Sequence, residues 1–449
     1  MSMDRKHVWS YIALGVSALV YLALGYATPR ENFSQLLLLS VMAFGIYAYV
    51  TNQKLNVWHG IAAGLFFRLL FLFAIPALSD DYFRFVWDGR LLLAGENPYL
   101  HLPSYYLREG APSLPGITPQ LFEQLNSPGY YAVYPPVLQG VFWLATALFP
   151  DSLFGSIVVM RVVILLAEAG SIFLLLRLMR RMGLPDRYVL LYALNPLVIL
   201  ELTGNLHMEA LMIFFLLLCL YQLHYQRYRI AAIPFALAIG AKLLPLMFLP
   251  FVWRRLGTKR FLAFGSVLLV VLLALFFPLL SPEVLRSFSQ SINLYFQRFE
   301  FNASIYYLLR WLGIQLTGYN QIAVIGPFLS LVTLVTVLSL AAVKKLGSIR
   351  RMAGYMAAAL TVYLFLSTTV HPWYICTLVA LTSMSYFRYA AVWSGLALFS
   401  YATYRTDSYT ENLLLVALEY TLVFLWLWAE LHLYRQQKKH ANLPRHHTV

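Results

Sequence analysis

Runs of about 17 to 25 apolar residues recur along the whole chain, and each is long enough to cross the hydrocarbon core of a bilayer as a helix. The strands of a membrane barrel would instead give alternating segments of about 10 residues. The sequence therefore predicts an all-α polytopic membrane protein with about 12 transmembrane helices. These helices are expected near residues 8–27, 34–50, 57–78, 155–178, 188–203, 207–225, 261–281, 321–343, 352–369, 372–387, 389–404 and 411–434.

Two stretches lack the pattern of a full span. Residues 79–155 are rich in proline and glycine, and their last apolar run, PVLQGVFWLATALF, holds only about 14 residues, which predicts an interfacial or half-inserted helix. Residues 230–253 are interrupted by prolines, which predicts a re-entrant hairpin of two half-length helices. We expect one domain over residues 1–434, with a second outer loop at 282–320 and a disordered basic cytoplasmic tail at 435–449.

The composition agrees with a membrane protein and argues against nucleic-acid binding. Hydrophobic residues make up 60% of the 449 residues and charged residues only 12%. The net charge of +14 comes from basic residues in short loops between apolar runs, which is the positive-inside pattern. This pattern predicts cytoplasmic termini and places residues 79–155 on the non-cytoplasmic side. Both cysteines, Cys219 and Cys376, fall in apolar runs, so neither a disulfide framework nor a cysteine metal site is expected.

The motif SDDYFRFVWDGR, residues 79–90, follows an apolar run directly. Two adjacent carboxylates repel each other, so one should have a raised pKa or a cation nearby. Asp81, Arg84 and Asp88 share one face of the predicted helix. A helix start capped by Ser79 would explain the two acids. It would not require the arginines and aromatic residues, so we consider the motif a candidate catalytic element.

The motif and its sequel resemble a known family. SDDYFRFVWDGRLLLAGENPY, followed by YPPVLQGVFWLA, resembles the first large loop of membrane-embedded GT-C glycosyltransferases. The likeness is greatest to mannosyltransferases that use a polyprenyl-phosphate sugar, including the enzyme that adds the first mannose of the GPI anchor and its bacterial relatives. LYALNPLVILELTGNLHMEALMI, AKLLPLMFLP and HPWY match the same pattern, so the likeness extends over roughly residues 60–380. Two additional N-terminal helices depart from the family and affect the expected helix count.

The resemblance implies that an aspartate of the first outer loop is the catalytic base, and this role falls on Asp80 or Asp81. We favour Asp81, because Tyr82 follows it as an aromatic residue follows the family's acidic pair. The chemistry is consistent, since a lipid phosphate is a good leaving group. Such a reaction needs a carboxylate to take the acceptor's proton and cationic groups to hold the phosphate.

Other polar and aromatic residues are candidate substrate contacts. Lys242 is a charge inside the apolar hairpin, which indicates function, although snorkelling to the interface would also explain it. His207 and Glu209 could hold a divalent metal with the aspartates, but the pattern is short, so no cofactor is certain and the metal ligands stay unknown. Tyrosines of the loop could stack on sugars or form an interfacial belt. The candidate substrate-binding residues are Arg84, Asp88, Arg90, Tyr134, Asn205, His207, Glu209, Lys242, Arg298, His371, Trp373 and Tyr374.

Arg161 and Glu168 lie seven positions apart on one predicted helix. This spacing is too long for a direct pair, so we expect each to pair with another helix. Arg161 is also a candidate phosphate contact.

The expected function is transfer of a hexose, with mannose favoured, from a polyprenyl-phosphate donor to a glycan or lipid acceptor. The site would face the non-cytoplasmic side of what we expect to be a bacterial inner membrane, and the other partner is the lipid bilayer. A transporter or flippase of a lipid-linked glycan is the alternative, because transporters also use broken hairpins and buried charges. The lack of an internal repeat argues against it. A polymerase or ligase acting on lipid-linked glycans is distinguished only by the resemblance.

Overall fold

The computed structural model describes residues 5–279, 281–342, 346–405 and 409–441, and in these ranges the chain is helical without a named strand. The first third holds α1 (Arg5–Tyr26), α2 (Phe33–Asn52), α3 (Val57–Leu70), α4 (Asp81–Leu93), η1 (Pro103–Leu107), α5 (Pro119–Glu123) and α6 (Pro136–Leu148). The middle holds α7 (Leu153–Arg181), η2 (Asp186–Val189), α8 (Leu190–Ala193), η3 (Val198–Gly204), α9 (Glu209–His224), α10 (Tyr228–Ala241), η4 (Leu244–Phe248), α11 (Leu249–Phe276) and η5 (Phe277–Leu279). The last third holds α12 (Pro282–Arg298), α13 (Ile305–Thr317), α14 (Ile322–Ala341), α15 (Ile349–Leu366), α16 (Tyr374–Ser383), α17 (Tyr389–Leu396), η6 (Ala397–Arg405) and α18 (Leu413–Ala441).

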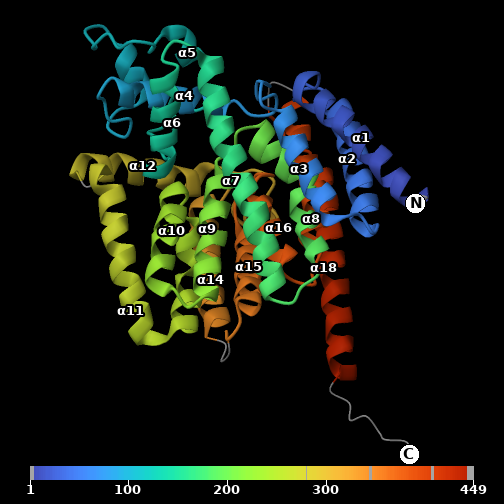
Figure 1. Cartoon of the computed structure of the whole chain (residues 1–449). Helices are drawn as coiled ribbons and strands as arrows, with labels where there is room; N and C mark the ends of the chain where they lie inside the picture. The colour runs from blue at the N-terminus through green and yellow to red at the C-terminus, as the bar shows by residue number, and fades with distance from the viewer. Residues whose placement is uncertain (1–4, 280, 343–345, 406–408, 442–449) are drawn as a thin grey trace, which may run out of the picture.

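The helices form a bundle with a cap at one end. Figure 1 shows α4, α5 and α6 gathered beyond the bundle, while α12 lies across the end of α10 and α11. The cap comes from the segment that we predicted as the first outer loop. Its α6 packs on α4 and also reaches α7 and α10, so the cap is tied directly to the bundle.

The predicted count of about 12 spans is not confirmed. Six helices of the described residues are long and apolar enough to cross a membrane, and a seventh span results if the bent pair η3 and α9 counts as one. The six are Val8–Tyr26, Phe33–Asn52, Leu153–Arg181, Leu244–Leu279, Ile322–Ala341 and Leu413–Lys438. Several other apolar runs form shorter helices: α3 and α10 have 14 residues each and α16 has 10.

Two of the shortened runs contain a proline, whose ring removes a backbone donor and disfavours helix at the preceding residue. The run predicted as a helix near 57–78 ends at Leu70 and continues without helix past Pro76. The run predicted near 188–203 is split around Pro196 into short turns and the π-helical η3. A π-helix is rare and is frequently found at functional sites.

The region predicted as a re-entrant hairpin consists of α10, a break and the start of α11. Lys242 has extended backbone angles after α10, and Gly257 interrupts α11 with φ 70° and ψ 165°. The segment between these breaks is thus a half-length helix, and re-entry stays a prediction. At the C-terminus, α18 continues through Ala441 into the segment for which we predicted disorder, and residues 442–449 lie outside the described ranges.

Candidate active site

Asp80 and Asp81 lie at the start of α4 and have different partners. Asp80 Oδ2 pairs with Arg30 Nη1 at 2.5 Å, and Arg30 comes from the loop between α1 and α2. Asp81 Oδ1 accepts a hydrogen bond of 2.7 Å from Asn126 Nδ2. The two adjacent carboxylates therefore have different electrostatic surroundings. Asp80 is neutralised by a cation, and Asp81 is held by a neutral amide.

Burial raises the pKa of Asp81 above its ordinary value, and the nearby His207 and the hydrogen bond from Asn126 partly oppose this shift. The negative charges of Glu209 and Asp80 add to the rise. These couplings indicate that Asp81 lies near His207 and Glu209. A carboxylate with a raised pKa is a better proton acceptor than an exposed one.

A buried network on the break between η3 and α9 orients His207. Its Nδ1 lies 3.0 Å from a carboxylate oxygen and 3.0 Å from the backbone oxygen of Glu201. Both oxygens accept, so Nδ1 carries a proton. Tyr401 donates to the same carboxylate at 2.7 Å and Asn205 at 3.2 Å. Asn205 also accepts from the backbone N–H of Leu78 at 3.2 Å, which ties the break to the segment before α4.

Trp373 lies between two histidine rings. Its ring centroid is 3.7 Å from that of His207 and 4.3 Å from that of His371, and both pairs are stacked. Backbone hydrogen bonds from Phe301 to Thr368 and from Val370 to Phe301 hold the loop before α16, which carries His371. The HPWY motif thus joins the same site as the aspartates, although it is far from them in the sequence.

Two ring nitrogens in this stack are free to bind a ligand. Among the described residues, His207 Nε2 and His371 Nδ1 are buried and have no hydrogen-bond partner. Burial lowers the pKa of His371 to about 3, and the positive charges of His207 and Lys242 add to this effect. His371 is therefore neutral at physiological pH and would contact a phosphate as a hydrogen-bond donor, not as a cation.

Lys242 is paired. Its ammonium group contacts the carboxylate of Glu209 and lies 3.9 Å from the ring centroid of Tyr374. The side chain of Lys242 is 32% exposed. An ion pair with a cation–π contact satisfies a lysine inside an apolar segment, and it keeps the charge near the Asp81 side of the bundle.

Three of the predicted substrate contacts, Arg84, Asp88 and Arg90, hold the cap together. Arg84 Nε donates to Asp88 at 2.8 Å, and Gln139 of α6 donates to the other oxygen of Asp88 at 3.0 Å. Arg90 donates to the backbone oxygens of Pro150 at 3.1 Å and Gly116 at 2.8 Å. Arg84 and Asp88 are buried.

Tyr134 packs edge-on against Phe85 and is close enough to Asp81 to be influenced by its charge. The side chain of Arg298 lies outside the described residues.

The sequence analysis missed Arg30, Asn126, Glu201 and Tyr401. Arg30, Asn126 and Tyr401 reach the site from segments with no motif, whereas Glu201 lies in a stretch that matches the family pattern and is the single acid of the apolar run PLVILELTG. That isolation was an available signal, because a charge inside an apolar segment is costly unless it is paired.

No group of three metal-ligating side chains is found within the described ranges, and the prediction of a divalent metal stays untested.

Arg161 and Glu168 each bind a partner on a neighbouring segment. Arg68 donates to Glu168 Oε2 at 2.9 and 3.0 Å, so the pair joins α3 to α7. Arg161 donates to the backbone oxygens of Thr203 at 2.9 Å and Gly204 at 3.0 Å, where η3 ends. A guanidinium at the carbonyl end of a helix satisfies its free acceptors.

Comparison with known proteins identifies the family of the chain. No curated protein matches the chain. Residues 10–256 match a family model described as alpha-(1->6)-mannopyranosyltransferase, N-terminal domain. The match covers more than half of the chain and includes both aspartates, the His207 network and Lys242. The chain therefore belongs to the MptA_B family of alpha-(1->6)-mannopyranosyltransferases.

Proposed function

We propose that the protein transfers mannose from a polyprenyl-phosphate donor to a glycan or lipid acceptor on the non-cytoplasmic side of the membrane, with Asp81 as general base. The observation that carries the proposal is the contrast within the acidic pair. Asp80 is neutralised by Arg30, whereas Asp81 has a raised pKa and lies beside the histidine stack. A mannosyltransferase needs one such carboxylate near a place where a sugar phosphate can bind.

The proposed step balances in atoms and charge. The acceptor hydroxyl gives its proton to Asp81 while its oxygen forms a bond to the anomeric carbon of mannose. The bond from that carbon to the phosphate oxygen breaks, and the electron pair leaves with the polyprenyl phosphate. No strong acid is needed, because the phosphate monoester is a good leaving group. A base of this kind contributes a rate factor of about 100 to 10,000.

The histidine stack and Lys242 are suited to the donor. Trp373 stacks with both histidine rings, and His207 Nε2 and His371 Nδ1 are buried polar atoms that lack protein partners within the described ranges. Buried polar atoms are usually satisfied, so these two are the natural contacts for sugar hydroxyls or phosphate oxygens. The Lys242 ammonium supplies positive charge nearby for the leaving phosphate.

The test is mannosyl transfer in membranes that contain wild type or Asp81→Asn. With radiolabelled polyprenyl-phosphate mannose and endogenous acceptors, wild type should transfer label and the variant should lose at least about 100-fold of the rate. Asp80→Asn is the matched control, since it removes a carboxylate of the same helix start but not the base. Wild-type turnover by Asp81→Asn would refute the assignment of the base.

If the wild type transfers no labelled mannose, the assay should be repeated with other lipid-phosphate sugars. Transfer from a nucleotide sugar but not from any lipid phosphate would refute the proposed donor.

A further inference from the structure

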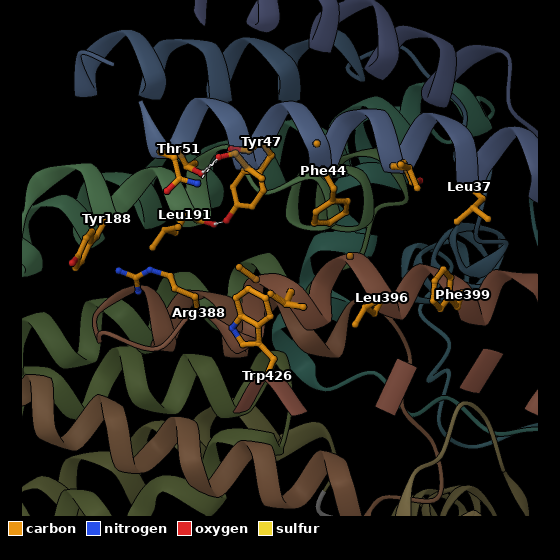
Figure 2. A pocket seen from close by; sticks show the side chains of 18 of the residues that line it. Leu37, Phe44, Tyr47, Thr51, Tyr188, Leu191, Arg388, Leu396, Phe399 and Trp426 are labelled. Carbon is orange, nitrogen blue, oxygen red and sulfur yellow. Dashed lines mark hydrogen bonds between the residues drawn. The ribbon is translucent and has the colours of Figure 1, made fainter. Parts of the chain in front are cut away.

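A second cavity lies outside the candidate active site, between α2 and the C-terminal elements α17, η6 and α18. Its volume is about 920 Å³, and its lining is mostly apolar, with Leu37, Phe44, Leu396, Phe399 and Trp426 along its length (Figure 2). Such a volume is at the upper end of the range for small-molecule pockets, about 300 to 1,000 Å³. Neither the family match nor the proposed transfer assigns a role to it.

The cavity is long and open to the surface. Its lining on α2 extends from Leu37 to Asn52, which corresponds to about 22 Å along a helix. The lining is thus longer than one leaflet's share of the hydrocarbon core, which is about 15 Å thick. Val41 and Trp426 line the cavity and are 62% and 48% exposed. An elongated apolar molecule could therefore enter from the bilayer and lie along α2.

One end of the cavity is basic. Arg187 and Arg388 line it beside Tyr188, whose ring centroid is 4.3 Å from the guanidinium carbon of Arg388. Figure 2 shows Arg388 and Tyr188 together at the end that also holds Thr51. Arg388 Nη1 donates to the backbone oxygens of Ser385 and Phe387, which holds its guanidinium in place.

The charge of Glu430 acts on Arg388, but its carboxylate binds backbone N–H groups and not the guanidinium. Both carboxylate oxygens of Glu430 accept from backbone N–H groups, those of Arg388 and Tyr389, at 2.8 to 3.1 Å. These groups lie at the start of α17, where a carboxylate is stabilised by the free helix donors. The two guanidinium groups therefore remain as positive charge for an anionic ligand.

The basic end is distant from the acidic pair. Arg30, which contacts Asp80, precedes the N-terminus of α2, whereas Asn52 and the two arginines mark its other end. A 20-residue helix is about 30 Å long. A lipid whose phosphate binds Arg187 and Arg388 could not present that phosphate to Asp81, so its headgroup phosphate is not the reacting one.

We propose that this cavity binds an anionic glycerophospholipid from the leaflet opposite Asp81. The headgroup phosphate lies between Arg187 and Arg388, and one acyl chain follows α2 toward Leu37. The lipid would join α2 to α17 and α18, so it would act as a structural ligand between the first and last parts of the chain. The proposal does not depend on the donor or on the catalytic base.

The experiment is native mass spectrometry of the purified full-length protein with three probes: phosphatidylglycerol, dioleoylglycerol and polyprenyl phosphate. Gly45→Phe fills the cavity, because Gly45 lines it and an added Cβ would meet no atom within 4 Å. Gly15→Phe on α1 is the matched control, since that glycine has the same open space but does not line the cavity. The double variant Arg187→Gln/Arg388→Gln tests the headgroup, with Arg229→Gln as its exposed control.

Wild type should bind phosphatidylglycerol more tightly than dioleoylglycerol, by roughly fivefold for each arginine. The double arginine variant should lose that preference, and Gly45→Phe should lose binding while melting at the wild-type temperature. Both controls should bind as wild type does. Full binding by Gly45→Phe, or equal binding of the two glycerolipids by wild type, would overturn the proposal. Loss of polyprenyl phosphate from Gly45→Phe but not from the arginine variant would also overturn it, because the cavity would then hold a donor chain.

Discussion

Two neighbouring carboxylates can have different roles only if their surroundings differ, and here the difference comes from two distant segments. Arg30 neutralises Asp80, and Asn126 donates to Asp81 without adding charge. The pair therefore does not have to share one proton, as carboxylates in direct contact often do. This division of partners is the reason for choosing Asp81 as the base.

Asn126→Ala should change the pH dependence of transfer. Its hydrogen bond stabilises the charged form of Asp81 and so lowers the pKa of that carboxyl, against the rise caused by burial. Without the bond the pKa should rise further, and a base works only when deprotonated. The acidic limb of kcat/KM against pH should therefore move to higher pH.

Gln120→Ala is the matched control for this change, because Gln120 is an exposed amide of the same cap. An unchanged acidic limb in Asn126→Ala would mean that Asp81 is not the group that titrates.

The link between Arg30 and Asp80 can be measured by a double-mutant cycle. Their side chains are 19% and 34% exposed, and partly exposed pairs contribute about 0 to 1 kcal/mol. Arg30→Gln and Asp80→Asn should each reduce transfer mildly, and the double variant should be no worse than the more affected single variant. Fully additive losses in kcat would show that the two residues act separately.

The sequence predicted candidate site residues but not their partners. It singled out the aspartates, His207, Glu209, Lys242 and HPWY, because each is a polar group inside an apolar run or at its edge. It could not find Arg30 or Tyr401, because an isolated arginine or tyrosine in a basic, tyrosine-rich chain carries no signal of its own. Packing between segments far apart in the sequence decides which carboxylate each of these residues contacts.

At the scale of elements, the site depends on helices that stop early. The end of α3, the π-helical η3 and the break at Lys242 all leave backbone groups without helical partners, and side chains such as Arg161 satisfy them. Apolar length in the sequence predicts where a helix can form, but it does not reveal where the helix will end. The count of about 12 spans was based on length, which is why it is not confirmed.

The buried pair of Arg68 and Glu168 should be essential for the packing of α3 on α7. Both side chains are fully buried, and Tyr192 donates to the second oxygen of Glu168 at 2.6 Å. Removing one partner leaves an unpaired buried charge, which costs about 3 to 5 kcal/mol. Glu168→Gln should therefore lower the melting temperature in detergent markedly.

The double variant Arg68→Met/Glu168→Met should melt closer to wild type than Glu168→Gln does, because it buries no lone charge. Arg177→Gln is the control on the same helix, since Arg177 is exposed. If Glu168→Gln and Arg177→Gln melted alike, the pair would contribute nothing to packing.

At the scale of the whole molecule, the cap with Asp81 and the basic turns should lie on opposite sides of the membrane. The cap occupies one end of the bundle in Figure 1, and the end of α11 away from α12 lies at the other end. Gly257 bends the chain within α11, between basic residues. The positive-inside rule then assigns this bend to the cytoplasm. The same assignment requires α10 and the first part of α11 to enter and leave on one side.

Cysteine labelling of intact cells tests this arrangement. Cys219 and Cys376 are buried, so wild type should give little background with a membrane-impermeant maleimide. Glu109→Cys in the cap should be labelled in intact cells, because Glu109 is exposed and the proposed topology places the cap on the non-cytoplasmic side. Arg229→Cys and Lys259→Cys flank the two half-length helices and should both be labelled only after the membrane is opened.

Labelling of Lys259→Cys but not Arg229→Cys in intact cells would instead make the segment a full crossing, because the two positions would then lie on opposite sides. In that case every later helix would be inverted, and the loop carrying His371 would no longer share a side with Asp81. The labelling pattern of these three positions therefore tests the hairpin and the shared face of the site together.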